Sequence, residues 1–301
     1  MPTTPNLDAQ VDGPQYLGPA TFLKARSLSE PEELDQWRPD VAVIGAPWDD
    51  STTYRPGARF GPRSVRVANY QPPSWHLGLE VAPFEVLKVV DYGDAVCYPG
   101  MTDQAHEAIR TRVAEVASRK IVPMVIGGDH SITYPSATAV ADAYGRGKVG
   151  IVHFDAHADT GRDSWGNLAS HATPMRRLIE SGAIPGRNFV QIGLRGYWPE
   201  REIFEWMRAQ GMRWHLMGEL LDRGVETVID QAISEALDGP ELIYLSVDID
   251  VLDPGFAPGT GTPEPGGMQY DHSEITAQNA NRCILDAISA LAVKKTRGGK
   301  P

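Results

Sequence analysis

Short apolar runs alternate with amphipathic segments along most of the chain. The apolar runs are rich in β-branched residues, as buried strands are, and lie at residues 41–45, 86–90, 121–126, 149–152, 189–192, 213–216 and 242–247. Segments with helical periodicity lie between them, at residues 102–118, 135–144, 173–180, 199–209 and 226–237. This alternation predicts βαβ units, and therefore an α/β fold in which helices cover both faces of a parallel sheet.

One domain is expected to hold these elements, because 301 residues fall within the range of a single large α/β domain. Residues 1–18 are polar and proline-rich, so we expect a mobile N-terminal arm there. Residues 294–301 are basic and glycine-rich, so we expect a disordered tail. The domain is therefore predicted to span residues 19–293.

Metal-type residues follow the run at residues 149–152, in the segment His153-Phe-Asp-Ala-His-Ala-Asp159. Asp155, His157 and Asp159 alternate, so an extended chain places them on one side. Open parallel sheets carry their sites at the carboxyl ends of strands. Carboxylates combined with imidazole suit Mn²⁺, Zn²⁺, Fe²⁺ or Ni²⁺ better than Ca²⁺ or Mg²⁺. The alternative is a solvated turn, where Asp is common.

Two other predicted strands end in the same way. Gly127-Gly128 allows a sharp turn that brings His130 close to a site, although a lone histidine at this place is often structural. Asp248 and Asp250 follow the run at residues 242–247, and their alternative role is capping or an Asx turn. Unpaired buried carboxylates are costly, so these groups need cations between them. The ligands are too many for one ion with an open position. They suit two ions that share carboxylate bridges and activate a water molecule.

Composition and charge restrict the classes of protein to which the chain can belong. The formal net charge of −11, from 39 acidic and 28 basic residues, argues against a nucleic-acid binder and is compatible with a small cationic substrate. Cys97 and Cys283 lie far apart and form no metal or redox motif, so a reducing cytoplasm is expected. No apolar run reaches the length of a membrane span, and the N-terminus lacks the pattern of a signal peptide.

Three motifs together resemble the signatures of the ureohydrolases, the family of arginase, agmatinase, formimidoylglutamase and guanidino-acid hydrolases. They are Gly127-Gly-Asp-His-Ser131, His153-Phe-Asp-Ala-His-Ala-Asp159 and Ser246-Val-Asp-Ile-Asp-Val-Leu-Asp-Pro254. Residues 54–62 and 257–267 are similar to the agmatinase-like branch. The resemblance implies a three-layer α/β/α sandwich on a parallel sheet. It also implies a manganese pair, with nickel in some guanidine hydrolases, and assembly as a homo-trimer or hexamer.

The resemblance also implies roles for single residues. One ion would be held by His130, Asp155, Asp159 and Asp248, and the other by His157, Asp155, Asp248 and Asp250. Asp155 and Asp248 would then be the bridges. His171, in Ser170-His-Ala-Thr-Pro174, resembles a loop histidine near the substrate, and imidazole suits proton transfer near neutral pH. Its alternative role is that of a residue at a helix N-terminus, and the family usually has Gly in place of Ala172.

The resemblance breaks after Gly266-Gly267. There the family continues through a helix and a strand that lies inside the sheet, and the end of that strand supplies a Glu for the substrate guanidinium. Here Met268-Gln269 runs directly into Tyr270-Asp-His272, so about 30 residues, the size of a βα unit, are absent. Glu264 and Glu274 lie nearby in the sequence, but neither matches that position.

The sequence therefore predicts a binuclear-metal hydrolase that cleaves a guanidino compound to urea and an amine. Agmatine is the leading substrate, because the long polar loop expected of arginase is not evident at residues 160–169. The alternatives are hydrolysis of guanidinobutyrate, of another guanidino acid or of guanidine. A further alternative is a metal-binding but catalytically impaired subunit that works only with an intact partner.

Overall fold

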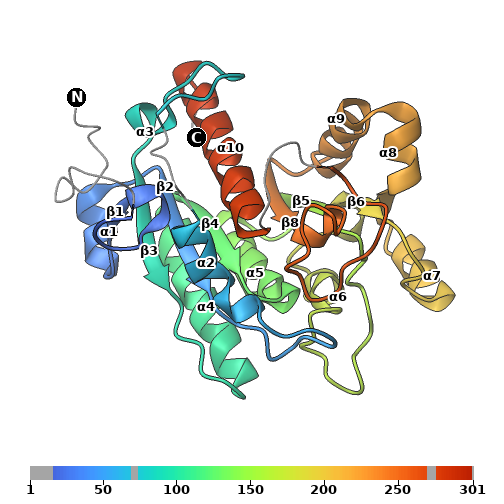
Figure 1. Cartoon of the computed structure of the whole chain (residues 1–301). Coiled ribbons are helices and arrows are strands. Elements are labelled where there is room, and N and C mark those ends of the chain that lie inside the picture. The colour runs from blue at the N-terminus through green and yellow to red at the C-terminus, as the bar shows by residue number, and fades with distance from the viewer. Residues whose placement is uncertain (1–15, 69–73, 270–275, 300–301) are drawn as a thin grey trace.

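A computed structural model describes residues 16–68, 74–269 and 276–299 (Figure 1). The strands are β1 (Arg26–Ser27), β2 (Val41–Ala46), β3 (Val89–Asp94), β4 (Val122–Gly127), β5 (Val149–Phe154), β6 (Phe189–Leu194), β7 (Arg213–Leu216) and β8 (Leu242–Val247). The α-helices are α1 (Pro31–Trp37), α2 (Gly61–Val67), α3 (Pro83–Val86), α4 (Thr102–Ala117), α5 (Thr133–Tyr144), α6 (Pro174–Glu180), α7 (Arg201–Ala209), α8 (Met217–Arg223), α9 (Val225–Ala236) and α10 (Thr276–Thr296). The short 3₁₀ helices are η1 (Phe22–Lys24), η2 (Ala58–Phe60), η3 (His130–Ile132), η4 (Gly186–Asn188) and η5 (Ile249–Val251).

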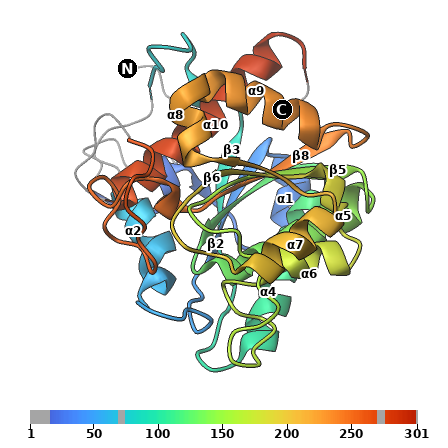
Figure 2. The same ribbon diagram turned by 90° about the vertical axis from the view of Figure 1, so that its right-hand side faces the viewer.

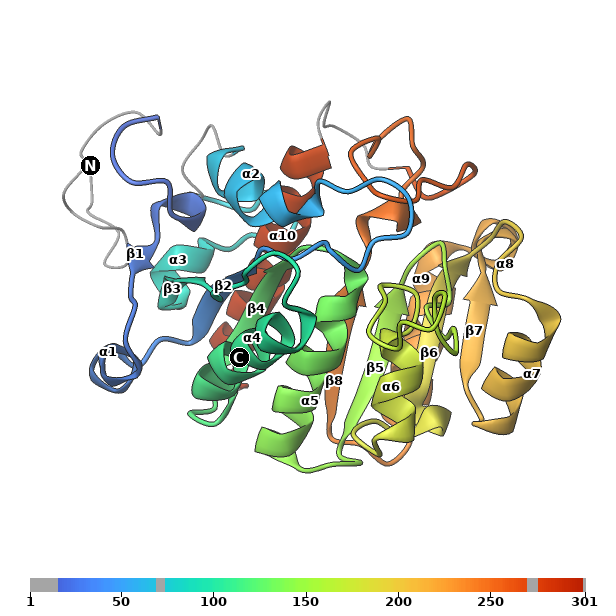
Figure 3. The ribbon, with the colours of Figure 1, turned by 90° about the horizontal axis from the view of Figure 1, so that it is seen from below.

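The strands form a middle layer between two layers of helices, which confirms the expected α/β architecture. They make two four-stranded sheets, in the orders β1-β3-β2-β4 and β7-β6-β5-β8, and every strand pair is parallel. Figure 2 shows α8, α9 and α10 on one side of the strands and α4, α6 and α7 on the other. Figure 3 shows α4, α5 and α6 side by side across both sheets.

The two faces of the strand layer are packed differently. On the side of α4–α7, one hydrophobic core runs across both sheets and includes Ile44, Ile109, Ile151 and Met175. On the other side the core is divided. One cluster joins β2–β4 to α10, and a separate one joins β5 and β6 to α8 and α9. The sheets are therefore held together mainly through one shared core.

The division lies between β4 and β8, which are the end strands of the two sheets. The carboxyl ends of these strands meet, because His130 Nε2, just after β4, lies 2.9 Å from Ser246 Oγ in β8. In the described part of the chain no strand pairs with the free edge of either one. As a result β8, although apolar in sequence, exposes Leu242, Leu245 and Val247. The single parallel sheet expected from the sequence is thus two sheets, which part between β4 and β8.

Several expected boundaries were wrong. The run at residues 86–90 is not one strand: it contains the end of α3 and the start of β3, since Pro83 at the first helical position favours a helix. The tail expected at residues 294–301 starts inside α10, which runs to Thr296. Lys295 Nζ lies 2.7 Å from Asp40 Oδ2, and this ion pair ties the helix end to the start of β2. Residues 1–15 of the expected arm lie outside the described residues. Among the described helices, none has the length and apolar character that a membrane span requires.

Candidate metal centre

A glycine turn after β4 places the first histidine of the site. Gly128 has a φ of +87°, and a Cβ there would lie 2.5 Å from the carbonyl oxygen of Ala46, so a larger residue does not fit. Asp129 follows and caps η3: its Oδ1 accepts the N–H of Ser131 at 2.9 Å and its Oδ2 accepts that of Ser51 at 3.0 Å. Burial raises the pKa of Asp129 to about 6, against the effect of these hydrogen bonds. Asp129 therefore fixes the turn that carries His130.

Three carboxylates from two other strand ends surround the His130 ring. His130 Nδ1 lies 3.0 Å from Asp155 Oδ2, 3.0 Å from Asp159 Oδ2 and 3.1 Å from Asp248 Oδ2. The nitrogen is buried, and within the described part of the chain it has no hydrogen-bond partner of suitable geometry. A nitrogen lone pair that converges with three oxygens fits a cation better than a hydrogen bond. These four residues are the set that the resemblance to the ureohydrolases assigned to one ion.

A second group adjoins the first and shares Asp155. His157 Nδ1 lies 3.1 Å from Asp250 Oδ2 and 3.6 Å from Asp155 Oδ1, and the three residues are close enough to hold an ion. Asp155 thus turns one oxygen to His130 and the other to His157, as a bridging carboxylate must. Asp248 contacts His130, and its Oδ1 accepts the N–H of Asp250 at 2.9 Å. All six predicted ligands therefore lie at one edge of the strand layer.

The pKa shifts show how strongly the cluster attracts positive charge. Burial alone would lower the pKa of both histidines, but the surrounding carboxylates raise that of His130 well above its usual range and that of His157 to about 11. Burial, together with the nearby charges of Asp248 and Asp155, raises the pKa of Asp250 well above its ordinary value. Asp155 is the exception: burial opposes its ionisation, yet the neighbouring histidines hold its pKa well below the usual range. Divalent cations in these two positions would replace the protons and balance the buried carboxylates.

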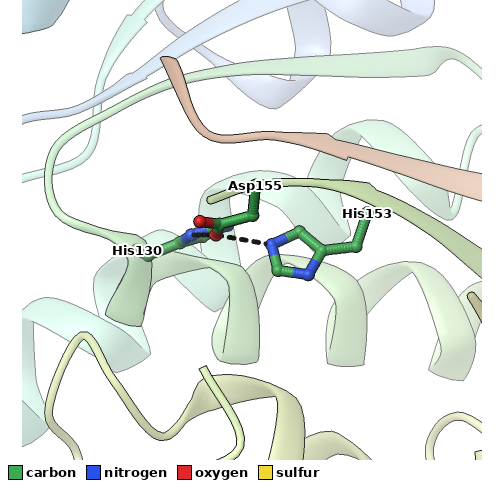
Figure 4. A group of neighbouring side chains, drawn as sticks. All are labelled: His130, His153 and Asp155. Atoms are coloured by element: carbon green, nitrogen blue, oxygen red, sulfur yellow. Dashed lines mark hydrogen bonds and ion pairs between the residues drawn. The ribbon is translucent and has the colours of Figure 1, made fainter. Parts of the chain in front are cut away.

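Two buried polar residues behind the site were not assigned a role from the sequence. His153 Nε2 lies 2.8 Å from Asp155 Oδ2 (Figure 4), and Gln191 Nε2 lies 3.0 Å from His153 Nδ1. His153 continues the alternation of Asp155, His157 and Asp159 by one step, so the period of a strand could have indicated it. Gln191 is a polar residue inside the otherwise apolar strand β6, which is the signal that was missed.

His171 lies on the loop before α6 and outside both groups of ligands. Its Nε2 lies 2.7 Å from Thr53 Oγ1, and its backbone N–H donates to the carbonyl of Ser51 at 3.2 Å. The loop after β2, which contains Thr53, is itself held by Asp49, whose Oδ2 accepts the N–H of Gly57 at 2.6 Å. His171 is therefore fixed by a loop far away in sequence, and its part in proton transfer stays a prediction.

The structure describes one of the two glutamates that were considered from the sequence. Glu264 lies beside the segment that follows β6. Its carboxyl carbon lies 2.7 Å from the position that a Cβ on Gly196 would take, and its carbonyl oxygen accepts a hydrogen bond from Arg195 Nη2 at 2.6 Å. Glu274 lies outside the described residues.

Comparison with known proteins identifies the family. The sequence profile of the arginase family matches residues 39–288. The guanidinopropionase of Pseudomonas aeruginosa is 40% identical over 287 residues, which cover 93% of this chain and 85% of that protein. The agmatinase of Chromobacterium violaceum is 32% identical over 321 aligned positions, which cover 94% of this chain and 92% of that protein.

These 321 positions exceed the 301 residues of this chain, so that agmatinase contains residues with no counterpart here. The solved proclavaminate amidino hydrolase of Streptomyces clavuligerus has a TM-score of 0.83 and 32% identity, and the match covers 93% of this chain and 99% of that one. With the profile and these relatives in agreement, the chain belongs to the arginase family and is a hydrolase of guanidino compounds.

Proposed function

We propose that the chain binds two Mn²⁺ ions, with Ni²⁺ as the alternative, and hydrolyses agmatine to urea and an amine. The observation that carries this proposal is the convergence of His130 Nδ1 with three carboxylate oxygens. The nitrogen forms no hydrogen bond of suitable geometry with any of the three. The position of Asp155 between the two histidines supports a pair of ions rather than one.

Each part of the chain then has a chemical task. Bound ions supply a water molecule of lowered pKa and stabilise charge that develops during attack. The four ligand carboxylates would hold the ions and balance the charge of two divalent cations, and the acidic balance of the whole chain favours a cationic substrate. Hydrolysis places the water oxygen on the guanidinium carbon and a proton on the departing nitrogen. We assign that proton transfer to His171, whose imidazole is held by Thr53 and is the type of group that transfers protons near neutral pH.

The choice of agmatine rests on likeness and charge. Residues 54–62 and 257–267 resemble the agmatinase-like branch, one relative is an agmatinase, and the net charge of −11 suits a substrate without a carboxylate. The guanidinopropionase relative supports the alternative, which is a guanidino acid such as guanidinobutyrate, or guanidine itself.

The split between β4 and β8 supports a second candidate function. A chain that keeps its metal ligands but lacks a carboxylate opposite the substrate would bind metal and turn over agmatine poorly, because a planar cation is best oriented by a bidentate carboxylate. Misplacement of about 1 Å can reduce a rate about a hundredfold. Such a chain would act as an impaired subunit together with an intact partner.

The wider assignment follows from the same likeness. We propose a cytoplasmic homo-trimer or hexamer that acts on a small cationic guanidino substrate and not on nucleic acid or a membrane. The acidic composition supports the exclusion of nucleic acid as a partner. The two separated free cysteines, Cys97 and Cys283, support a cytoplasmic location.

A urea-release assay tests both candidates. The purified, Mn²⁺-loaded protein is incubated with agmatine, guanidinobutyrate, guanidinopropionate or guanidine, first alone and then mixed with a full-length agmatinase. Fastest release from agmatine by the chain alone supports the first candidate. Release that rises above the sum of the two proteins on mixing supports the second. Release of urea from a guanidino acid in preference to agmatine would contradict the substrate assignment, and the Asp155→Ala variant is the inactive control.

A further inference from the structure

A buried polar pair lies behind the metal centre, between β5 and β6. His153 and Gln191 are register partners in these adjacent parallel strands, and both are 0% exposed. Burying an imidazole beside an amide is unfavourable unless their polar atoms are hydrogen-bonded. Three of the four side-chain nitrogen and oxygen atoms of the pair are hydrogen-bonded, and Gln191 Oε1 has no partner among the described residues. The way in which the three atoms are paired indicates what the pair does.

One carbonyl group determines the direction of the hydrogen bonds. Gln191 Nε2 lies 2.6 Å from the carbonyl oxygen of Ala158. A carbonyl only accepts, so the side of the amide that faces it must be the NH₂ group. The same nitrogen lies 3.0 Å from His153 Nδ1 and donates to it as well. Nδ1 therefore carries no proton, and the ring proton is on Nε2.

That ring proton points at a metal ligand. His153 Nε2 lies 2.8 Å from Asp155 Oδ2 and donates to it (Figure 4). The other oxygen, Oδ1, accepts the backbone N–H of His157 at 2.6 Å. A donor on each oxygen fixes the rotation of the carboxylate and leaves each oxygen a further lone pair for an ion. The edge-to-face contact of His153 with Phe189, at 6.1 Å between ring centroids, holds the plane of the imidazole.

We propose that Gln191 is a positioning residue for the metal centre, which acts by fixing the tautomer of His153 and thereby the orientation of Asp155. Through the carbonyl of Ala158, the same amide also holds the backbone between two further ligands. The proposal rests on the two-ion assignment above. His153 is close enough to His130 and Asp155 to be considered a ligand, but both of its ring nitrogens are already engaged. Loss of a residue that hydrogen-bonds to a metal ligand in this way typically reduces metal affinity by about 10–100-fold.

The tautomer is tested on the metal-free protein by two-dimensional ¹⁵N NMR with labelled histidine. We expect the His153 ring to carry its proton on Nε2 in the wild type. A proton on Nδ1 would overturn the proposal. Because this measurement needs neither metal nor a substitution, it holds even if a variant fails to fold.

The second test replaces the amide by an isosteric apolar side chain. Gln191→Met removes the donor to His153 Nδ1, and Ile192→Met is the matched control at the next position of the same buried strand. In titrations of the apoprotein with Mn²⁺, Gln191→Met should bind about 10–100-fold more weakly with the same number of ions at saturation. Ile192→Met should bind as the wild type does. Wild-type affinity in a folded Gln191→Met protein would overturn the proposal.

A third test separates a donor to a ligand from a ligand. In His153→Gln an amide N–H can take the place of the Nε2 donor, whereas His153→Leu offers none. We expect His153→Gln to recover most of the Mn²⁺ affinity that His153→Leu loses. If both variants lose one equivalent of Mn²⁺ at saturation, His153 is itself a ligand and the proposal is wrong.

These tests also separate the proposal from the proposed function. A wild-type protein that binds two Mn²⁺ ions but releases no urea from any guanidino compound contradicts the hydrolytic function, and the effect of Gln191→Met on affinity then still supports the positioning role. A wild-type protein that binds no Mn²⁺ overturns both.

Discussion

Strands β5 and β8 supply the same kind of ligand from very different surroundings. β5 lies between two strands and is buried over almost its whole length. β8 pairs only with β5 among the described residues, and Leu245 and Val247 are 52% and 47% exposed. Nevertheless both strands end in carboxylates that reach His130, namely Asp155 and Asp248. A ligand's position thus depends on where its strand ends, and not on complete burial of the strand.

Local hydrogen bonds explain why the end of β8 is in place. The N–H of Asp248 donates to the carbonyl of Phe154 at 2.8 Å, which ties it to β5. Its Oδ1 then caps the short helix that carries Asp250. Among the residues that the structure describes, no strand supports the remainder of β8 on its open side. We therefore expect metal binding to be robust and the region around β8 to be the weaker part of the fold.

The largest effect is expected where both histidines share a ligand. Asp155→Ala removes the carboxylate that faces His130 and His157, so bound Mn²⁺ should fall from about two equivalents to near zero, with loss of urea release. His130→Ala should remove mainly one ion. Elemental analysis of the loaded proteins measures this, and the exposed loop residue Asp163 provides the control Asp163→Ala. Retention of one full equivalent in Asp155→Ala would contradict the bridging role.

The next effect concerns the division between the sheets. Insertion of a family-like βα segment of about 30 residues between Met268 and Gln269 should raise both the melting temperature and the rate of urea release. The reason is that a strand between β4 and β8 would pair their free edges and cover the apolar side chains of β8. A Gly/Ser linker of equal length is the control. If the linker has the same effect as the segment, strand pairing is not the cause.

Truncations in the two strands should differ in their effect on stability. Ile151→Ala in β5 removes a fully buried side chain and should reduce the free energy of unfolding by about 2–5 kcal/mol. Leu245→Ala in β8 removes a half-exposed one and should cost about 1 kcal/mol. Denaturant unfolding of the two variants makes the comparison. Equal losses of the free energy of unfolding would mean that β8 is buried in solution to the same extent as β5.

Amide exchange should alternate along β8. The N–H groups of Leu242 and Asp248 both donate toward β5. Because parallel strands alternate the sides to which their amides point, even-numbered amides face β5 and odd-numbered ones face the open edge. We expect Ile243, Leu245 and Val247 to exchange with solvent much faster than Tyr244 and Ser246, measured by NMR. Uniform protection would show that another strand covers the edge.

The smallest expected effect is the number of protons that the protein releases when it binds Mn²⁺. The carboxylates, against the effect of burial, raise the pKa of His157 to about 11 in the metal-free protein, so at pH 8 the ring is protonated and must release that proton to bind an ion. Affinity for Mn²⁺ should therefore rise as the pH increases, by up to about tenfold per unit for each proton displaced. Calorimetry in two buffers with different ionisation heats counts the protons. No release at pH 8 would contradict the role of His157 as a ligand.

The sequence by itself determined the order of seven strands, β2 to β8, and of five helices, α4, α5, α6, α7 and α9, together with the identity of the six metal-type residues. Both depend on local features: the period of apolar positions, the glycine turn at Gly127-Gly128, and acidic residues that alternate after an apolar run. Convergence of His130, Asp155 and Asp248 followed from one further rule, because the carboxyl ends of parallel strands share one edge of the strand layer.

Only the tertiary structure decided the contacts between distant parts of the chain. Those contacts separate β4 from β8, join His171 to Thr53 across 118 positions, and pair Gln191 with His153 across 38 positions. They also hold the end of α10, which lies inside the expected tail, against the start of β2 through Lys295 and Asp40. A hydrogen bond of this kind depends on how strands pair and pack, and the local pattern of residues at one end of the bond carries no information about the residue at the other end.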